Sequence, residues 1–131
     1  SNGTTFESIE TTREVYIKVI ASATSLSTGT LEYFSIPNIL GGKTLRSIKS
    51  HVYTASSSGT PEFNVSNVTR GNRSLLRIPS KIDVNTYDSN FSVTPEVVAS
   101  GLTFTTGDAL SLNCITAGTG TKGWDLILRF N

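Results

Sequence analysis

The residues that could support catalysis are few in this chain, and their spacing does not suit it. The sequence contains one histidine, His51, and one cysteine, Cys114. Nucleophilic catalysis needs a nucleophile, a base and an orienting group, and the chain has no Gly-x-Ser-x-Gly turn to present a serine. Cys114 keeps the alternating phase of Leu110 and Leu112, which is typical of a small buried thiol. We therefore expect no catalytic residues and a chain that is not an enzyme.

Potential metal ligands are equally sparse. One His and one Cys cannot supply the usual nitrogen and sulfur ligands of zinc. Calcium prefers oxygen ligands, and four oxygen-bearing side chains lie close together in the sequence: Asp83, Asn85, Asp88 and Asn90. Their spacing differs from that of an EF-hand loop, and Asp and Asn are also common in ordinary turns, where they bond to nearby backbone. Turn formation is the preferred interpretation, calcium is the weaker alternative, and we expect no metal and no cofactor.

Aromatic side chains offer the best prospect of a ligand contact. Tyr87 and Phe91 lie in a polar loop at residues 85–92. There, a ring could stack on a sugar or pack back on the domain. Trp124 instead keeps the phase of Leu126, so it is expected in the core. Tyr87 and Phe91 are thus the candidate ligand contacts.

The charge balance argues against several partners. Eleven basic and ten acidic residues leave a formal net charge of +1. The nearest basic cluster is Arg70, Arg73 and Arg77, which suits a solvated loop entering a strand better than a phosphate site. No segment approaches the roughly twenty apolar residues of a membrane span, and no signal peptide is visible. We expect neither nucleic acid nor membrane as a partner.

Strands must position these residues, because apolar side chains alternate along much of the chain. In residues 14–22, Val15, Ile17 and Val19 share one face, as in a half-buried strand, although a helix is the alternative there. Residues 22–30 are expected to form a loop. Residues 43–54 are expected to form a strand whose apolar residues do not keep one phase, because of a bulge or a switch of face. Further strands are expected at residues 31–36, 63–68, 75–78, 97–104, 110–114 and 124–130. About eight to ten short strands predict an all-β sandwich or barrel.

A chain of 131 residues fits a single domain. Residues 1–12 are polar, and we expect a flexible N-terminal arm or a cloning remnant there, followed by one β-sandwich domain at residues 13–131. The two alternating runs at the end of the chain are joined by the glycine-rich residues 117–123. This pattern predicts a hairpin.

The closing segment also resembles a known group of proteins. Thr-Gly-Asp-Ala-Leu-Ser-Leu (106–112), Ala-Gly-Thr-Gly-Thr-Lys-Gly (117–123) and Trp-Asp-Leu-Ile-Leu-Arg-Phe (124–130) resemble the closing hairpin of bacteriophage virion structural proteins with jelly-roll-like β-sandwiches. Residues 58–71 resemble the mid-domain strand and turn of the same group. The resemblance implies an antiparallel, jelly-roll-like sandwich and a non-enzymatic tail-fibre, spike, head-fibre or capsid decoration protein.

The same resemblance implies partners and a location. The partners would be further copies of the chain, with a trimer favoured, together with other virion proteins and a host-surface glycan. The location would be the virion, assembled in the host cytoplasm. Tyr16, Ile20 and Ile127 are the candidate interface residues, because they lie on the outer side of predicted strands. The alternative is a monomeric carbohydrate-binding module of a larger protein that uses Tyr87 and Phe91.

Overall fold

The alternating pattern becomes strands over about half of residues 12–131, which are the residues that the computed structural model describes. Residues 1–11 of the predicted arm lie outside them. No helix in the described residues is long and apolar enough to cross a membrane. The elements are β1 (Arg13–Ser25), β2 (Gly29–Ser35), the 3-10 turn η1 (Asn38–Leu40), β3 (Leu45–His51), β4 (Glu62–Asn67), β5 (Arg73–Ser74), β6 (Leu76–Ile78), β7 (Ser80–Lys81), the 3-10 turn η2 (Ser89–Phe91), β8 (Val97–Val98), β9 (Ala109–Thr116) and β10 (Lys122–Phe130).

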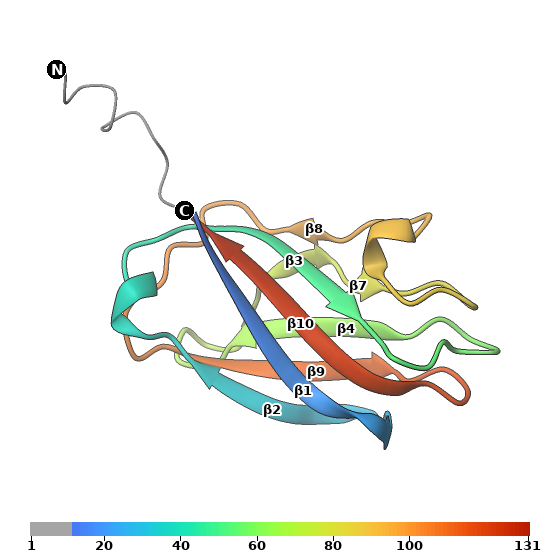
Figure 1. Cartoon of the computed structure of the whole chain (residues 1–131). Helices are drawn as coiled ribbons and strands as arrows, with labels where there is room; N and C mark the ends of the chain where they lie inside the picture. The colour runs from blue at the N-terminus through green and yellow to red at the C-terminus, as the bar shows by residue number, and fades with distance from the viewer. Residues whose placement is uncertain (1–11) are drawn as a thin grey trace, which may run out of the picture.

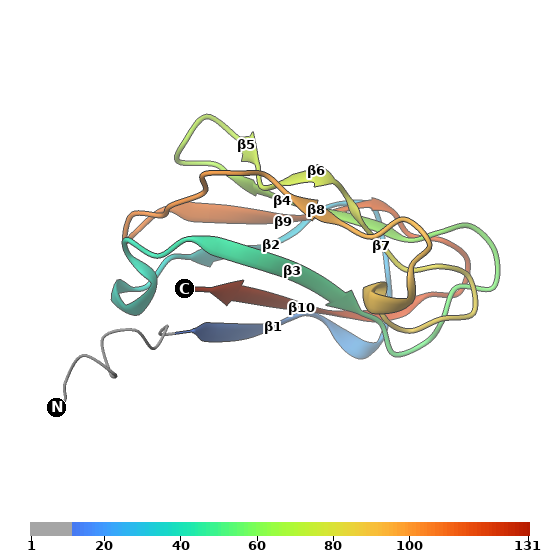
Figure 2. The same ribbon diagram turned by 90° about the horizontal axis from the view of Figure 1, so that it is seen from above.

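Two antiparallel sheets pack face to face (Figures 1 and 2). One has the strand order β1-β10-β3 and the other the order β2-β9-β4-β5, with β7 also paired to β4 and with β6 and β8 forming a short separate pair. The chain changes sheet on passing from β1 to β2, from β2 to β3, from β3 to β4 and from β9 to β10. The predicted all-β sandwich is confirmed, and its strand order is that of a jelly roll.

The last two strands do not form the predicted hairpin. β9 pairs with β2 and β4, whereas β10 pairs with β1 and β3. The loop between them crosses from one sheet to the other, and its residues Gly118 and Gly120 have positive φ angles. Two amphipathic strands with a glycine-rich connection are compatible with a hairpin and also with a loop that crosses between sheets. Only the strand partners distinguish the two arrangements.

The first strand confirms the predicted alternation and rules out a helix there. Val15 and Ile17 are half-buried and Val19 is buried. β1 also extends through residues 22–25, the first part of the predicted loop, because Ser25 still pairs with Lys122 of β10. Residues 22–25 are exposed polar or small residues, so backbone hydrogen bonding rather than burial extends the strand.

A bulge in β3 accounts for its broken phase. Arg129 of β10 pairs with Ser47, and the next residue, Phe130, pairs with Leu45, so Arg46 is the additional residue. A bulge of this kind lets a strand bend while it keeps its apolar side chains inside. Leu45 and Ile48 are accordingly both buried.

The core lies between the two sheets. Trp124 is fully buried and stacks on Phe63 with ring centroids 4.2 Å apart, and Phe104 meets Phe130 edge-on at 5.6 Å. Cys114 is buried, as predicted, and burial raises the pKa of its thiol to about 11. Each fully buried large apolar side chain contributes about 1.5–3 kcal/mol. This core gives the connecting loops a fixed frame.

Candidate functional site

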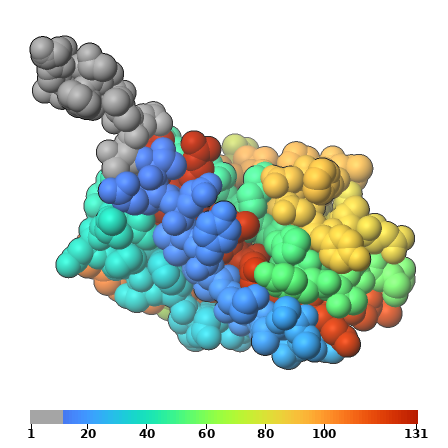
Figure 3. Space-filling view, in the orientation of Figure 1, coloured from blue at the N-terminus to red at the C-terminus, as the bar shows by residue number. Residues whose placement is uncertain are grey.

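The connection between β7 and β8 exposes three large apolar side chains. We call residues 82–96 the apolar loop; it is the yellow to orange segment that carries η2 (Figures 1 and 3). The exposed fractions are 52% for Tyr87, 73% for Phe91 and 89% for Val93. Single exposed apolar residues are normal on any surface, but a group of them marks a candidate contact site. The candidates Tyr87 and Phe91 therefore lie together on one exposed loop.

A buried carboxylate fixes the end of the apolar loop. Glu96 has a side chain only 2% exposed, and its Oε2 accepts a bond from Lys49 Nζ at 3.1 Å. Its Oε1 accepts bonds from the hydroxyls of Ser80 at 3.1 Å and Ser89 at 2.8 Å. Charge-assisted bonds of this kind are the stronger ones in proteins. They tie the loop to β3 and to β7.

The serines around Glu96 complete this anchor. Ser50 and Ser80 have their hydroxyl oxygens 2.9 Å apart, and the backbone N–H of Ser50 donates to Ser89 Oγ at 3.0 Å. All three serines are fully buried, so no substrate reaches their hydroxyls. The cluster holds the loop in place.

The acidic residues of the loop form turns. Asp83 accepts bonds from the backbone N–H of Val93 at 2.9 Å and from the Ser92 hydroxyl. Asp88 accepts a bond from the backbone N–H of Asn90 at 2.8 Å and precedes η2. Such bonds to neighbouring backbone are what Asp does in turns.

Two of the calcium candidates, Asp83 and Asp88, already accept bonds from the loop backbone. In the described part of the chain, no group of three or more His, Cys, Asp or Glu side chains is arranged to hold a metal ion. Asn85 adopts a positive φ of 63°, which Asn tolerates better than most residues. The role of Asp83, Asn85, Asp88 and Asn90 that the geometry supports is to shape the apolar loop.

A band of polar and aromatic side chains lies beside the loop on the β1-β10-β3 sheet. Asp88 is 3.7 Å from His51 Nδ1 (an ion pair when the histidine is protonated), and the His51 ring meets Tyr53 edge-on at 5.0 Å. The Tyr53 hydroxyl donates to Asp125, which also accepts from Lys18 Nζ at 3.0 Å. The hydrogen bond to Asp125 raises the pKa of Lys18. These contacts connect the loop to the outer face of the sheet.

That outer face contains two of the three candidate interface residues. Tyr16, which is 70% exposed, pairs across the strands with Ile127, which in turn pairs with Lys49. This sheet faces the viewer in Figures 1 and 3. Ile20 does not join the face as expected. A register shift after Lys18 places it opposite Trp124, and it packs against the core.

Sequence reasoning missed Val93 and Glu96. Val93 lies between Ser92 and Thr94 and shortly before Pro95, and this polar surrounding in a loop could have identified it as an exposed apolar residue. Glu96 has no comparable local pattern, because its partners Lys49, Ser80 and Ser89 lie on separate segments.

Comparison of the chain with protein-family models, curated proteins and solved structures finds no match.

Proposed function

We propose that this chain is a non-enzymatic structural domain of a bacteriophage particle, of the tail-fibre, spike or capsid decoration type, which works as a homo-oligomer and attaches to a host surface. The apolar loop is the observation that carries the proposal. Tyr87, Phe91 and Val93 are exposed on a loop that the buried Glu96 fixes in place. A contact surface that is ordered before binding loses less entropy on binding. This arrangement suits attachment.

The virion setting rests on the sequence resemblance. The resembling segments are residues 58–71 and 106–130. The observed strand order agrees with the jelly-roll-like sandwich that they imply, but residues 106–130 do not form the closing hairpin. A rigid sandwich suits such a role because its loops can carry contacts without disturbing the core.

The oligomer is proposed to form through the outer face of the β1-β10-β3 sheet. Tyr16 and Ile127 form an apolar pair there. The cross-strand neighbours on either side are charged on both strands: Glu14 opposite Arg129 and Lys18 opposite Asp125. An apolar centre with a polar rim is the usual anatomy of a protein–protein interface.

The second candidate is a monomeric carbohydrate-binding module, and the exposed rings of Tyr87 and Phe91 favour it. Aromatic rings with one polar end suit partly wet contact surfaces. The two proposed functions share the apolar loop but differ in subunit number, so the mass of the purified protein in solution distinguishes them.

An array of bacterial surface polysaccharides tests the attachment role. We expect the purified chain to bind at least one of them and Phe91→Ser to weaken that binding about tenfold or more, because exposed aromatic anchors dominate contact energies. Tyr33→Ser is the matched control, since Tyr33 is 62% exposed but lies on β2, in the other sheet. Unchanged binding by Phe91→Ser, or equal loss in both variants, would show that the apolar loop is not the contact surface.

A further inference from the structure

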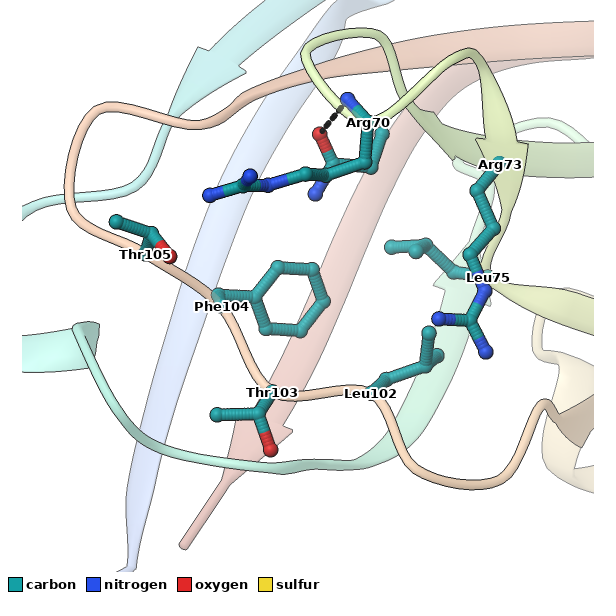
Figure 4. Close-up of a pocket in the computed structure, with 8 residues that line it drawn as sticks. Arg70, Arg73, Leu75, Leu102, Thr103, Phe104 and Thr105 are labelled. Atoms are coloured by element: carbon teal, nitrogen blue, oxygen red, sulfur yellow. Dashed lines mark hydrogen bonds between the residues drawn. The ribbon is translucent and has the colours of Figure 1, made fainter.

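A pocket lies away from the apolar loop. This pocket, of about 400 Å³, opens between the turn that follows β4 and the segment that precedes β9 (Figure 4). β7, which leads into the apolar loop, pairs with the start of β4 at Glu62 and Phe63, whereas the pocket begins at Asn67, the last residue of β4. Its volume lies within the range of small-molecule sites, about 300–1,000 Å³.

One wall of the pocket is a fixed ion pair. Arg70 Nη2 lies 3.3 Å from Asp108 Oδ1, and its Nε donates to Oδ2 at 3.4 Å. Asp108 is buried and also accepts bonds from the Asn67 amide at 3.2 Å and the Thr105 backbone N–H at 3.1 Å. The charge of Arg70 is thus balanced within the protein. Arg70 shapes the pocket more than it supplies free charge.

The opposite wall carries an arginine without an acidic partner. Arg73 lies across the pocket from Arg70 (Figure 4). Its Nη2 donates to the Ser100 carbonyl at 3.3 Å. Among residues 12–131, no ion pair involves Arg73. A guanidinium has five N–H donors in a planar arrangement that matches a carboxylate. Most of the donors of Arg73 are therefore available to an anionic ligand.

Apolar side chains lie between the two arginines. Leu75, Leu102 and Phe104 form the floor, and Thr103 and Thr105 stand at its side (Figure 4). Three apolar and five polar residues thus line the pocket, and pockets that combine apolar side chains with placed polar groups bind small molecules through burial and an oriented polar contact. The lining therefore suits a ligand with one negative charge and an apolar body.

We propose that this pocket binds a small organic carboxylate, with Arg73 holding the carboxylate and the Leu75–Leu102–Phe104 floor contacting the apolar body. This site is independent of the attachment role of the apolar loop. It would give the domain a small-molecule ligand in addition to its surface contacts.

Titration followed by ¹H–¹⁵N NMR with three probes tests the proposal: benzoate, benzamide, which lacks the charge, and acetate, which lacks the apolar body. We expect benzoate to shift the amides of residues 73–75 and 102–105 saturably, and the other two probes to bind at least about tenfold more weakly. Arg73→Gln should weaken benzoate binding about tenfold. Arg77→Gln is the matched control, because Arg77 is exposed on β6 and does not line the pocket.

Three results would overturn the proposal. The first is the absence of saturable shifts at these amides with benzoate. The second is equal weakening by Arg73→Gln and Arg77→Gln, which would indicate nonspecific attraction to positive charge. The third is acetate or benzamide binding as tightly as benzoate, which would show that the site does not need both the charge and the apolar body.

Discussion

Asp108 is a buried carboxylate that the fold keeps ionised. Burial by itself would raise its pKa, but hydrogen bonds from Thr105, Asn67 and Arg70, together with the charge of Arg70, hold the pKa of Asp108 below its ordinary value. A carboxylate whose pKa is lowered by folding stabilises the folded state at pH values above the unfolded pKa, about 3.9. That stabilisation is lost as the pH falls through the lower, folded pKa.

Asp108→Asn is therefore predicted to destabilise the protein in a pH-dependent manner. At neutral pH the variant should lose about 1.5–3 kcal/mol of unfolding free energy, because bonds to a charged group are lost. Below about pH 4 the difference from the wild type should shrink, since the unfolded wild-type chain takes up a proton at Asp108 there while the folded protein takes it up only at lower pH. Denaturant unfolding at a series of pH values measures the loss of unfolding free energy at neutral pH and its decrease in acid. A difference that stays constant down to acid pH would contradict this account of Asp108.

Individual residues differ in how far the sequence predicts them. Trp124 and Cys114 are confirmed as core residues, because their phase with neighbouring leucines reports which side of a strand they occupy. The burial of Glu96 and Asp108 has no such local cause. Each is surrounded by partners from distant segments, such as Lys49 for Glu96 and Arg70 for Asp108, so only the folded chain reveals them.

At the scale of the elements, the start of β10 depends on one glycine. Gly123 has a φ of +74°, and a Cβ at this position would lie 2.8 Å from Tyr53 Cδ2 and 2.9 Å from Ser22 Cα. Gly120, three residues earlier, has a φ of +72° but no atom within 4 Å of the corresponding Cβ position. The two glycines share a backbone conformation and differ in packing.

Gly123→Ala should consequently be more destabilising than Gly120→Ala. Both variants bear the cost of a left-handed residue with a Cβ, roughly 1–2 kcal/mol, but only Gly123→Ala adds a clash with the Ser22 backbone. Thermal unfolding followed by circular dichroism compares the two melting temperatures. Equal decreases would show that packing at Gly123 is looser than the structure indicates.

The apolar loop should lose order when its anchor is weakened. Glu96→Gln removes the charge that Lys49 and the two serine hydroxyls share, so amide hydrogen exchange in residues 82–96 should accelerate while β9 and β10 stay protected. Glu32→Gln, an exposed position on β2 in the other sheet, serves as the control. If exchange in the loop did not change in Glu96→Gln, the buried network would not be what orders it.

The strands differ in how far the sequence pattern predicts them. The bulge in β3 is predictable, because Leu45 and Ile48 cannot share a face in a regular strand. The partners of β9 and β10 are not predictable, because alternation shows which side of a strand is apolar but does not show which strands lie next to it. A jelly roll places these two strands in different sheets. A hairpin between them is therefore incompatible with the jelly-roll-like fold.

At the scale of the whole molecule, the two outer sheet faces differ in character. On the β2-β9-β4-β5 sheet, one cross-strand row consists of Tyr33, Ser111, Ser66 and Ser74. All four carry a hydroxyl group and none is charged. The β1-β10-β3 face instead combines the Tyr16–Ile127 pair with flanking charges. The fold class follows from strand number and turn spacing in the sequence, but this difference between faces depends on strand order, which the sequence does not show.

The mass of the protein in solution, measured by light scattering behind a sizing column, tests the proposed function most directly. The chain has a mass of 14.0 kDa, and we predict a stable trimer or larger closed ring for the wild type. Tyr16→Glu should dissociate it to the monomer, whereas Tyr33→Glu, on the other sheet, should not. A wild-type protein that runs as a monomer would contradict the oligomeric virion domain and favour the carbohydrate-binding module.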